Sequence, residues 1–147
     1  MNVHFSSQSN EWTTPNDFYK ELNKEFNFTL DPCCTKTNAK CKKFFTKKDD
    51  GLSKDWFNET VFMNPPYGRE IKNWIKKAYE ESLKGALVVC LIPARTDTTY
   101  WHNYCMKGEI RFIKGRLKFS NKISAPFPSA VGIFRNCLLY TSPSPRD

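Results

Sequence analysis

The sequence contains no run of about 18 apolar residues, the length that a helix needs to cross a membrane. Its first ten residues, MNVHFSSQSN, also lack the basic and apolar regions of a signal peptide. We therefore expect a protein of the cytoplasm with no membrane partner. A chain of 147 residues is the size of one ordinary domain, so a single hydrophobic core is expected.

Close pairs of metal ligands are missing as well. Cys33, Cys34 and Cys41 form a C-C-x6-C cluster, but the six cysteines include no C-x2-C pair, and the chain has two histidines. Structural zinc usually requires ligands in close pairs. We expect no metal site and reduced thiols, several of them buried.

Acidic residues are absent from one basic stretch, RFIKGRLKFSNK, in a chain whose net charge is +8. Such a balance favours a polyanionic partner, although a uniformly solvated basic surface gives the same count. Arg116 and Lys118 alternate with Leu117 and Phe119, as on a strand with one face on the core. Their charged face fits contacts with phosphates; a solvated strand edge protected by Lys and Arg is the alternative.

Hydrophobic periodicity predicts alternating helices and strands. The helices are expected at residues 15–26, 69–85 and 96–108, and the strands at FNFTLD, KKFFT, TVFM, ALVVCLI, EIRFI, RLKF and SAVGIF. Thr14 is expected to cap the first helix, with Pro15 at its first position. ALVVCLI is apolar throughout, which is typical of a parallel strand covered on both faces. The order predicts an α/β domain with a largely parallel central sheet flanked by helices.

Composition also suggests the limits of the domain. Residues 1–10 are polar and are expected to form a flexible arm, and residues 11–136 carry the periodic segments. Residues 137–147, with their Ser-Pro repeats, are expected to form a disordered tail, for which a non-native ending is the alternative.

The segment VFMNPPYGREIKNW places Asn64, Pro65, Pro66 and Tyr67 between a predicted strand and a predicted helix. Ligands of open α/β sheets bind beyond the carboxyl ends of the strands, where this loop is expected. A simple turn would use the same residues. However, the two prolines remove two N–H donors and fix φ, so that the Asn64 side chain and the Pro65 carbonyl can present rigid acceptors.

Two acceptors beside the flat ring of Tyr67 suit a planar group with an exocyclic NH2. Adenine, cytosine, guanine and the amide of glutamine all carry such a group. When both N–H bonds are held by acceptors, the nitrogen lone pair is concentrated for attack on an activated methyl group. No general base of unusual pKa is required before this attack.

On these residues the chain resembles the phage-type, Dam-like DNA adenine N6-methyltransferases, which use S-adenosylmethionine. The resemblance spans residues 10–135 and rests on EWTTP, LDPCCTKTNAKC, FFTKKDDGLSKDW, FMNPPYG, LIPARTDTTYW, RFIKGRLKF and APFPSAVGIFR, in that order. It implies a Rossmann-like class I methyltransferase domain, methyl transfer to the N6 amine of adenine in DNA, and an origin in a phage or prophage of a bacterial host.

The resemblance assigns roles to single residues. It makes Asn64 to Tyr67 the loop that holds the amine. It implies cofactor contacts from Thr14, Pro15, Asp31, Asn38 and Asp50, with Asp49 as the rival of Asp50. The loop after Asp31 contains no glycine, unlike the usual cofactor motif, so its shape is expected to differ.

Contact with DNA is expected from Arg95, Arg116 and Lys118, and the substrate is expected to be double-stranded. The target adenine would then have to leave the stack, and Tyr67 would offer it a stacking surface. Two other functions stay open: an NPPY methyltransferase acting on RNA or on protein glutamine, and a non-catalytic nucleic-acid-binding relative. The recognition sequence and the oligomeric state do not follow from the sequence.

Overall fold

The computed structural model describes residues 12–119 and 123–136. Both the expected arm at residues 1–10 and the expected tail at 137–147 lie outside the described residues. The helices are α2 (Asn16–Phe26), α3 (Ile71–Leu83) and α4 (Thr99–Asn103), with short 3-10 turns η1 (Gly51–Ser53) and η2 (Cys105–Lys107). The strands are β1 (Leu30–Cys34), β2 (Lys43–Thr46), β3 (Thr60–Met63), β4 (Leu87–Pro93), β5 (Glu109–Phe112) and β6 (Ser129–Phe134).

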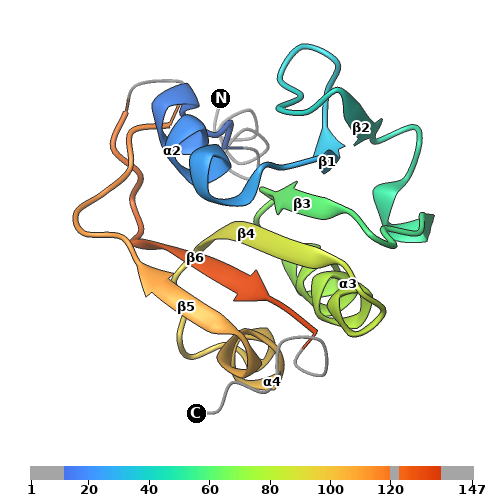
Figure 1. Ribbon diagram of the computed structural model, residues 1–147. Helices are drawn as coiled ribbons and strands as arrows, with labels where there is room; N and C mark the ends of the chain where they lie inside the picture. Colours follow the sequence, from blue (N-terminus) through green and yellow to red (C-terminus); the bar gives the residue numbers. More distant parts are fainter. Residues whose placement is uncertain (1–11, 120–122, 137–147) are drawn as a thin grey trace.

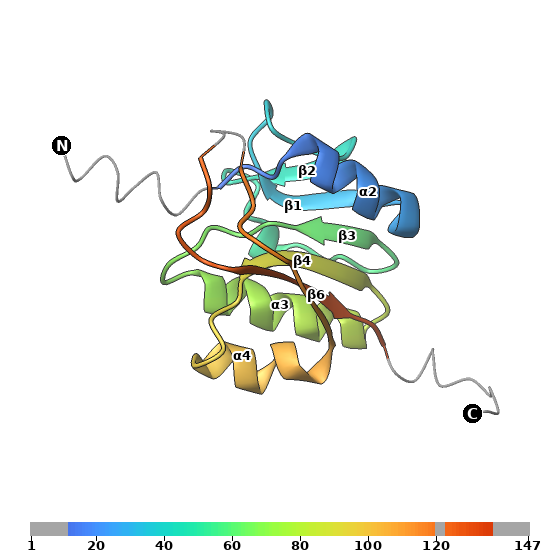
Figure 2. The same cartoon turned by 90° about the vertical axis from the view of Figure 1, so that its left-hand side faces the viewer.

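These strands form one sheet in the order β2-β1-β3-β4-β6-β5, which can be followed in Figure 2 for the labelled strands. The pairs β1–β2, β1–β3 and β3–β4 are parallel, whereas β6 is antiparallel to both β4 and β5. The sheet is thus mixed but largely parallel. The α/β fold class predicted from the sequence is confirmed.

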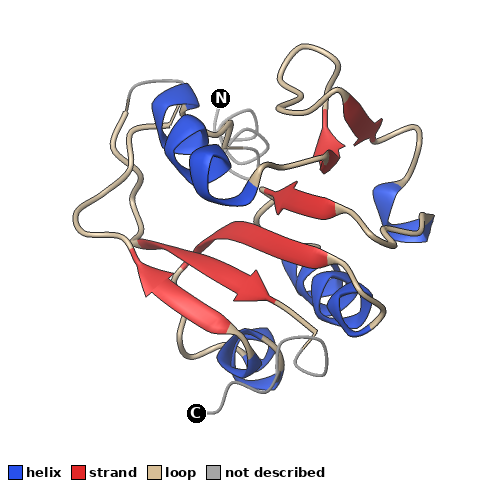
Figure 3. Cartoon of the chain, in the orientation of Figure 1, coloured by secondary structure: helices blue, strands red, loops and turns tan. Residues whose placement is uncertain are grey.

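Helices cover both faces of the sheet (Figures 1 and 3). Phe18, Leu22 and Phe26 of α2 pack on the face that carries Val89 and Val131. On the other face, buried side chains of α3 and α4 form the larger core together with Val88, Cys90 and Ile92 of β4. Each residue of β4 after Leu87 is buried, as its unbroken apolar sequence predicts.

Three local expectations are wrong. Thr14 is not the cap of α2: Pro15 occupies the N-cap position, and the Thr14 hydroxyl instead accepts a hydrogen bond from Asn64. Asp31 does not end the first strand: it is the second residue of β1, which begins only at Leu30, after the left-handed turn at Asn27, and runs on to Cys34. RLKF forms no strand; it makes one isolated bridge, Lys118 to Ser124, while Phe119 is buried.

No helix of the described residues has the length and apolarity that a membrane span requires. Within the same residues, no cluster of three or more His, Cys, Asp or Glu side chains is arranged to hold a metal ion.

Candidate active site

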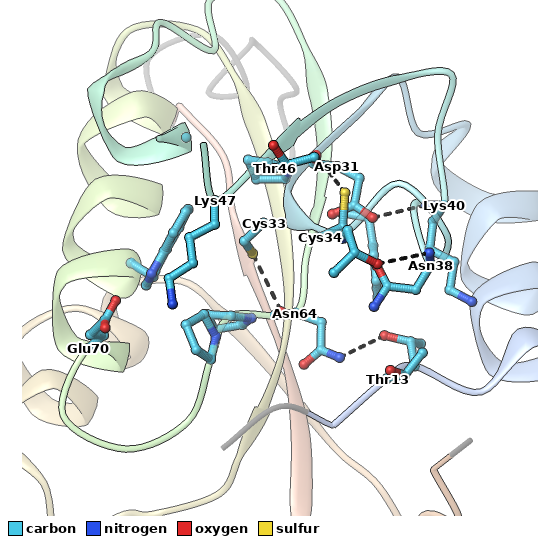
Figure 4. A pocket seen from close by; sticks show the side chains of 18 of the residues that line it. Thr13, Asp31, Cys33, Cys34, Asn38, Lys40, Thr46, Lys47, Asn64 and Glu70 are labelled. Atoms are coloured by element: carbon cyan, nitrogen blue, oxygen red, sulfur yellow. Dashed lines mark hydrogen bonds between the residues drawn. The ribbon is translucent and has the colours of Figure 1, made fainter. Parts of the chain in front are cut away.

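A cavity of about 370 Å³ opens where β1, β2 and β3 end. Such a volume is within the range of small-molecule sites. Figure 4 shows Glu70 and Lys47 on one side, Asp31, Asn38 and Lys40 on the other, and Asn64 between them. Parallel strands bring their carboxyl ends to one edge of the sheet, which explains why residues far apart in the sequence meet here.

Asn64 has one end of its amide fixed and the other end unpaired. Its Nδ2 donates to the Trp12 carbonyl and, at 2.9 Å, to the Thr14 hydroxyl. A carbonyl can only accept, so the contact with Trp12 determines which way the amide faces. Asn64 Oδ1 is buried and has no hydrogen-bond partner among the described residues. The site therefore presents a pre-oriented acceptor.

The backbone of the NPPY loop is held by a hydrogen bond from Cys33 and restricted by its two prolines. The Cys33 Sγ donates to the Asn64 carbonyl at 3.4 Å, and burial holds the pKa of this thiol well above its usual range, so it keeps its proton. Pro65 and Pro66 line the cavity. Their rings restrict the backbone on the C-terminal side of Asn64.

Tyr67 does not line the cavity. Its side chain is 4% exposed, its ring meets Phe127 edge to face with centroids 5.5 Å apart, and its hydroxyl donates to the Leu91 carbonyl at 3.2 Å. Burial raises the pKa of the phenol well above its usual value, which keeps it a donor. In this conformation the ring is part of the core that supports the loop.

Asp31 lies inside the cavity wall and is 4% exposed. One carboxylate oxygen accepts the backbone N–H of Lys40 at 3.0 Å. Burial raises the pKa of Asp31 to about 6, against the opposing effect of hydrogen bonds to its carboxylate. Near neutral pH the site therefore contains a carboxylate that is incompletely compensated by the protein.

Asp50, rather than Asp49, faces the cavity. The Asp49 carboxylate is used locally, since it accepts from the backbone N–H and the hydroxyl of Thr46 at 2.8 and 3.1 Å. Asp50 has φ of 57° and directs the chain into η1. This turn places Gly51 against the Pro32 carbonyl, where a Cβ would come within 2.1 Å of the oxygen.

The glycine-free loop after β1 is closed by side chains. Asn38 Oδ1 accepts the Thr35 N–H at 2.7 Å, and the Asn38 N–H donates to the Thr35 hydroxyl at 3.2 Å. Both residues line the cavity. The neighbouring segment supplies a glycine at a close backbone contact, because Gly51 lies against the Pro32 carbonyl.

The family to which this arrangement belongs follows from the sequence. The family described as DNA N-6-adenine-methyltransferase (Dam) matches residues 4–132. The chain belongs to the Dam family. The DNA N-6-adenine-methyltransferase of Haemophilus phage HP1 (strain HP1c1) is 30% identical over 120 residues, which cover 78% of this chain and 69% of the relative. The DNA N-6-adenine-methyltransferase of Escherichia phage T1 is 29% identical over 92 residues, 61% of this chain and 38% of that protein.

For this Dam-family chain, the residues expected to contact DNA lie apart from the cavity lining. Arg95 is exposed just past β4, with its guanidinium over the Phe127 ring at 5.8 Å. Arg116 donates to the Ala125 carbonyl at 3.4 Å. Lys118 takes part in the isolated bridge to Ser124. Of these three, Arg95 lies next to Phe127, and through it near Tyr67.

Several cavity residues were missed by the sequence analysis. Trp12 and Glu70 line the cavity, and so does Trp74. Trp74 belongs to the apolar stripe of α3, a pattern that does not distinguish the wall of a cavity from the core. The contact of Trp12 with Asn64 joins residues that are 52 positions apart, so no local sequence pattern predicts it. Pro15 lies next to the lining residue Thr14 but is not itself part of the lining.

Proposed function

We propose that this chain transfers the methyl group of S-adenosylmethionine to the exocyclic N6 amine of adenine in DNA. The target base would be turned out of the duplex and enter the cavity at the NPPY loop. Membership of the Dam family supports the reaction class and the substrate. Since the relatives come from phages, DNA in the cytoplasm of a bacterial host is the expected setting.

The observation that carries the proposal is the unpaired Oδ1 of Asn64. A buried acceptor without a partner costs stability, so its presence in a cavity favours a ligand that donates there. The N6 amine has two N–H groups: Asn64 Oδ1 can accept one, and the Pro65 carbonyl is the expected acceptor for the other. Acceptors that are already in place stabilise the positive charge that develops on nitrogen during attack.

The cavity suits S-adenosylmethionine in its chemistry. Asp31 and Asp50 supply acidic acceptors, Asn38 and Thr35 supply polar groups, and Pro32 and Leu52 supply apolar surface. When bound, S-adenosylmethionine supplies an electrophilic methyl group on a positively charged sulfur. Asp31 near neutral pH provides negative charge in the wall, and Asp50 provides a carboxylate able to accept hydrogen bonds from hydroxyl or amine groups.

Stacking of the target adenine on Tyr67 is a separable part of the proposal. In the structure this ring packs on Phe127 and its hydroxyl bonds to Leu91. Stacking would therefore require the ring to leave these contacts when DNA binds. The amine-holding role of Asn64 does not depend on that movement, because its amide is fixed by Trp12 and Thr14.

The test is an incubation with adenine-containing duplex DNA and S-adenosylmethionine carrying a labelled methyl group. We expect N6-methyladenine after digestion of the DNA, measured by mass spectrometry. RNA and protein glutamine substrates are run in parallel, and label in either of them instead of DNA would contradict the proposal. Failure to bind S-adenosylmethionine in calorimetry would favour the non-catalytic alternative.

The variant Asn64→Ala isolates the mechanism. We expect kcat to fall about 100-fold or more, as for other acceptors and donors positioned for transition-state charge, while affinity for S-adenosylhomocysteine stays close to that of the unaltered protein. Asn73→Ala, on the exposed side of α3, is the matched control and should keep its turnover. Near-normal turnover of Asn64→Ala would remove Asn64 from the reaction.

A further inference from the structure

Two tryptophans stack beneath the cavity, and they differ in one hydrogen bond. The rings of Trp56 and Trp74 have centroids 6.4 Å apart and planes inclined by 21°. Trp56 is fully buried, and its Nε1 donates to the Gly51 carbonyl at 3.0 Å. Trp74 is 7% exposed, and its Nε1 is buried without a hydrogen-bond partner among the described residues.

An indole N–H can only donate, and its burial without an acceptor is unfavourable. Trp74 also lines the cavity, whereas Trp56 does not. The residue that carries this unpaired donor therefore borders a space that can contain an acceptor from a ligand. Asn64 Oδ1 is the complementary case in the same cavity: an unpaired acceptor ten residues before Trp74, in the connection that leads from β3 to α3.

The neighbours of Trp74 restrict what that ligand group can be. A Cβ on Gly51 would lie 3.2 Å from Trp74 Cη2, so Trp74 stands next to the turn that carries Asp50. Glu70, one helical turn before Trp74, lines the same cavity. Two carboxylates in this part of the wall disfavour an anionic group such as the carboxylate of a methionine end. A neutral nucleoside, with ring nitrogens and ribose oxygens as acceptors and an apolar face, fits better.

We propose that Trp74 is a cofactor-binding residue whose Nε1 donates a hydrogen bond to the nucleoside part of S-adenosylmethionine. This rests on the proposed function as far as the identity of the cofactor is concerned. The contact adds a donor from α3 to a site whose loop after β1 lacks glycine, and it gives the first turns of α3 a direct part in binding.

The test compares Trp74→Phe with Trp56→Phe in two measurements that a purely structural role would move together. The first is thermal unfolding without ligand. Both variants replace the indole by a smaller ring, but Trp74→Phe gives up no hydrogen bond within the protein, so its Tm should fall less than that of Trp56→Phe. Trp56→Phe leaves the Gly51 carbonyl without its donor, so its Tm should fall.

The second measurement is calorimetric binding of S-adenosylhomocysteine. Trp74→Phe should weaken this affinity about 3- to 10-fold, the range for one neutral hydrogen bond. Adenosine, used as a competing ligand, should lose affinity by the same factor.

Four results would overturn the inference. Unchanged affinity of Trp74→Phe would mean that water satisfies the indole. A lowered Tm equal to that of Trp56→Phe would mean that the N–H is bonded within the protein. Weaker binding of S-adenosylhomocysteine with unchanged adenosine affinity would exclude the nucleoside. If the unaltered chain bound no S-adenosylhomocysteine, the proposed function would fail together with this inference. The first three results would overturn this inference alone, so the two failures are distinguishable.

Discussion

Acidic side chains have different surroundings in two parts of the sheet. The cavity half consists of β1, β2, β3 and the loops after them, and the basic half consists of β5, β6 and the segment 113–128 between them. In the cavity half, Asp31 is buried, bonds to a backbone N–H, and has a pKa raised by burial. In the basic half, Glu109 bonds to Arg111 and Arg135, and the guanidinium of Arg111 lowers the pKa of this carboxyl.

This difference separates charge that is available to a ligand from charge that the fold already uses. Arg111 also holds Glu25 of α2 through two hydrogen bonds of 2.7 and 2.8 Å. The net positive charge of the sequence therefore overstates the number of basic side chains that are free to contact DNA. One of them, Arg111, instead joins β5 to α2 through Glu25. The incompletely compensated group lies in the cavity, where a ligand can reach it.

The largest effect, on the unfolding free energy, is expected from adding a side chain at the close backbone contact of Gly51 in the cavity half. Gly51→Ala would place a Cβ 2.1 Å from the Pro32 carbonyl oxygen, so the two backbone segments must separate, at a cost of about 3 kcal/mol or more in unfolding free energy. Gly132→Ala in β6 is the control: its nearest atom would be Ile92 Cδ1 at 4.0 Å. Chemical denaturation should show a large loss for the first variant alone; equal losses would contradict the assigned contact.

The next effect tests the two acids. The pKa of Asp31 is raised from 3.8 to about 6 in the folded protein, so the folded state binds the extra proton, and stability is lost as the pH rises through 6. Asp31→Asn removes this loss and should gain about 2 to 3 kcal/mol at pH 7.5, with the gain shrinking toward pH 4.5. Denaturation at several pH values measures it.

Glu109→Gln is the opposite case and serves as the control for Asp31→Asn. Its folded pKa is lowered by Arg111, so the carboxylate adds stability above its unfolded pKa and the variant should be slightly less stable at pH 7.5. A gain for Asp31→Asn that does not vary with pH would argue against an ionised Asp31 as its cause.

A smaller effect, on kcat, is expected from the contact between Thr14 of the N-terminal segment and Asn64. Thr14→Val removes one of the two acceptors of Asn64 Nδ2 and should lower kcat about 3- to 10-fold without changing the affinity for S-adenosylhomocysteine. Thr14→Ser should restore turnover. Weaker S-adenosylhomocysteine binding by Thr14→Val would instead support the cofactor contact that the family resemblance implies.

The smallest effect distinguishes free from paired arginines. Arg95→Ala should reduce DNA affinity several-fold and make the slope of log K against log salt less negative by about 1. Arg111→Ala should leave that slope unchanged, because Glu25 and Glu109 already bind this guanidinium. A salt titration of duplex binding measures both, and equal slopes for the two variants would end the distinction.

Sequence periodicity was sufficient for most of the fold. The stripe of α3 and the apolar run of β4 are confirmed, because burial of one face or of both leaves a regular pattern of residues. RLKF has the alternation of a strand but forms none, since Phe119 instead packs its ring on Trp12. The start of β1 depends on the left-handed turn at Asn27, a conformation that the sequence allowed but did not require.

The site was only partly accessible from sequence, for a related reason. The position of Asn64 directly after a strand follows from the local pattern and is confirmed by the end of β3 at Met63. Its fixed amide depends on Trp12 and Thr14, and the wall opposite depends on Gly51 approaching Pro32. These contacts join segments that only the finished fold brings together. The apolar stripe of α3 predicts an ordinary core residue at Trp74, because an unpaired N–H has no counterpart in a sequence pattern.

The ring of Trp12 meets Phe119 and Phe127, with centroids 5.3 and 5.4 Å apart, while its carbonyl holds Asn64. The orientation of one amide therefore depends on residues from the beginning, the middle and the end of the described chain. Contacts of such long sequence separation form late, after loop closure. During folding, the orientation of this amide should thus be set only after the three segments have come together.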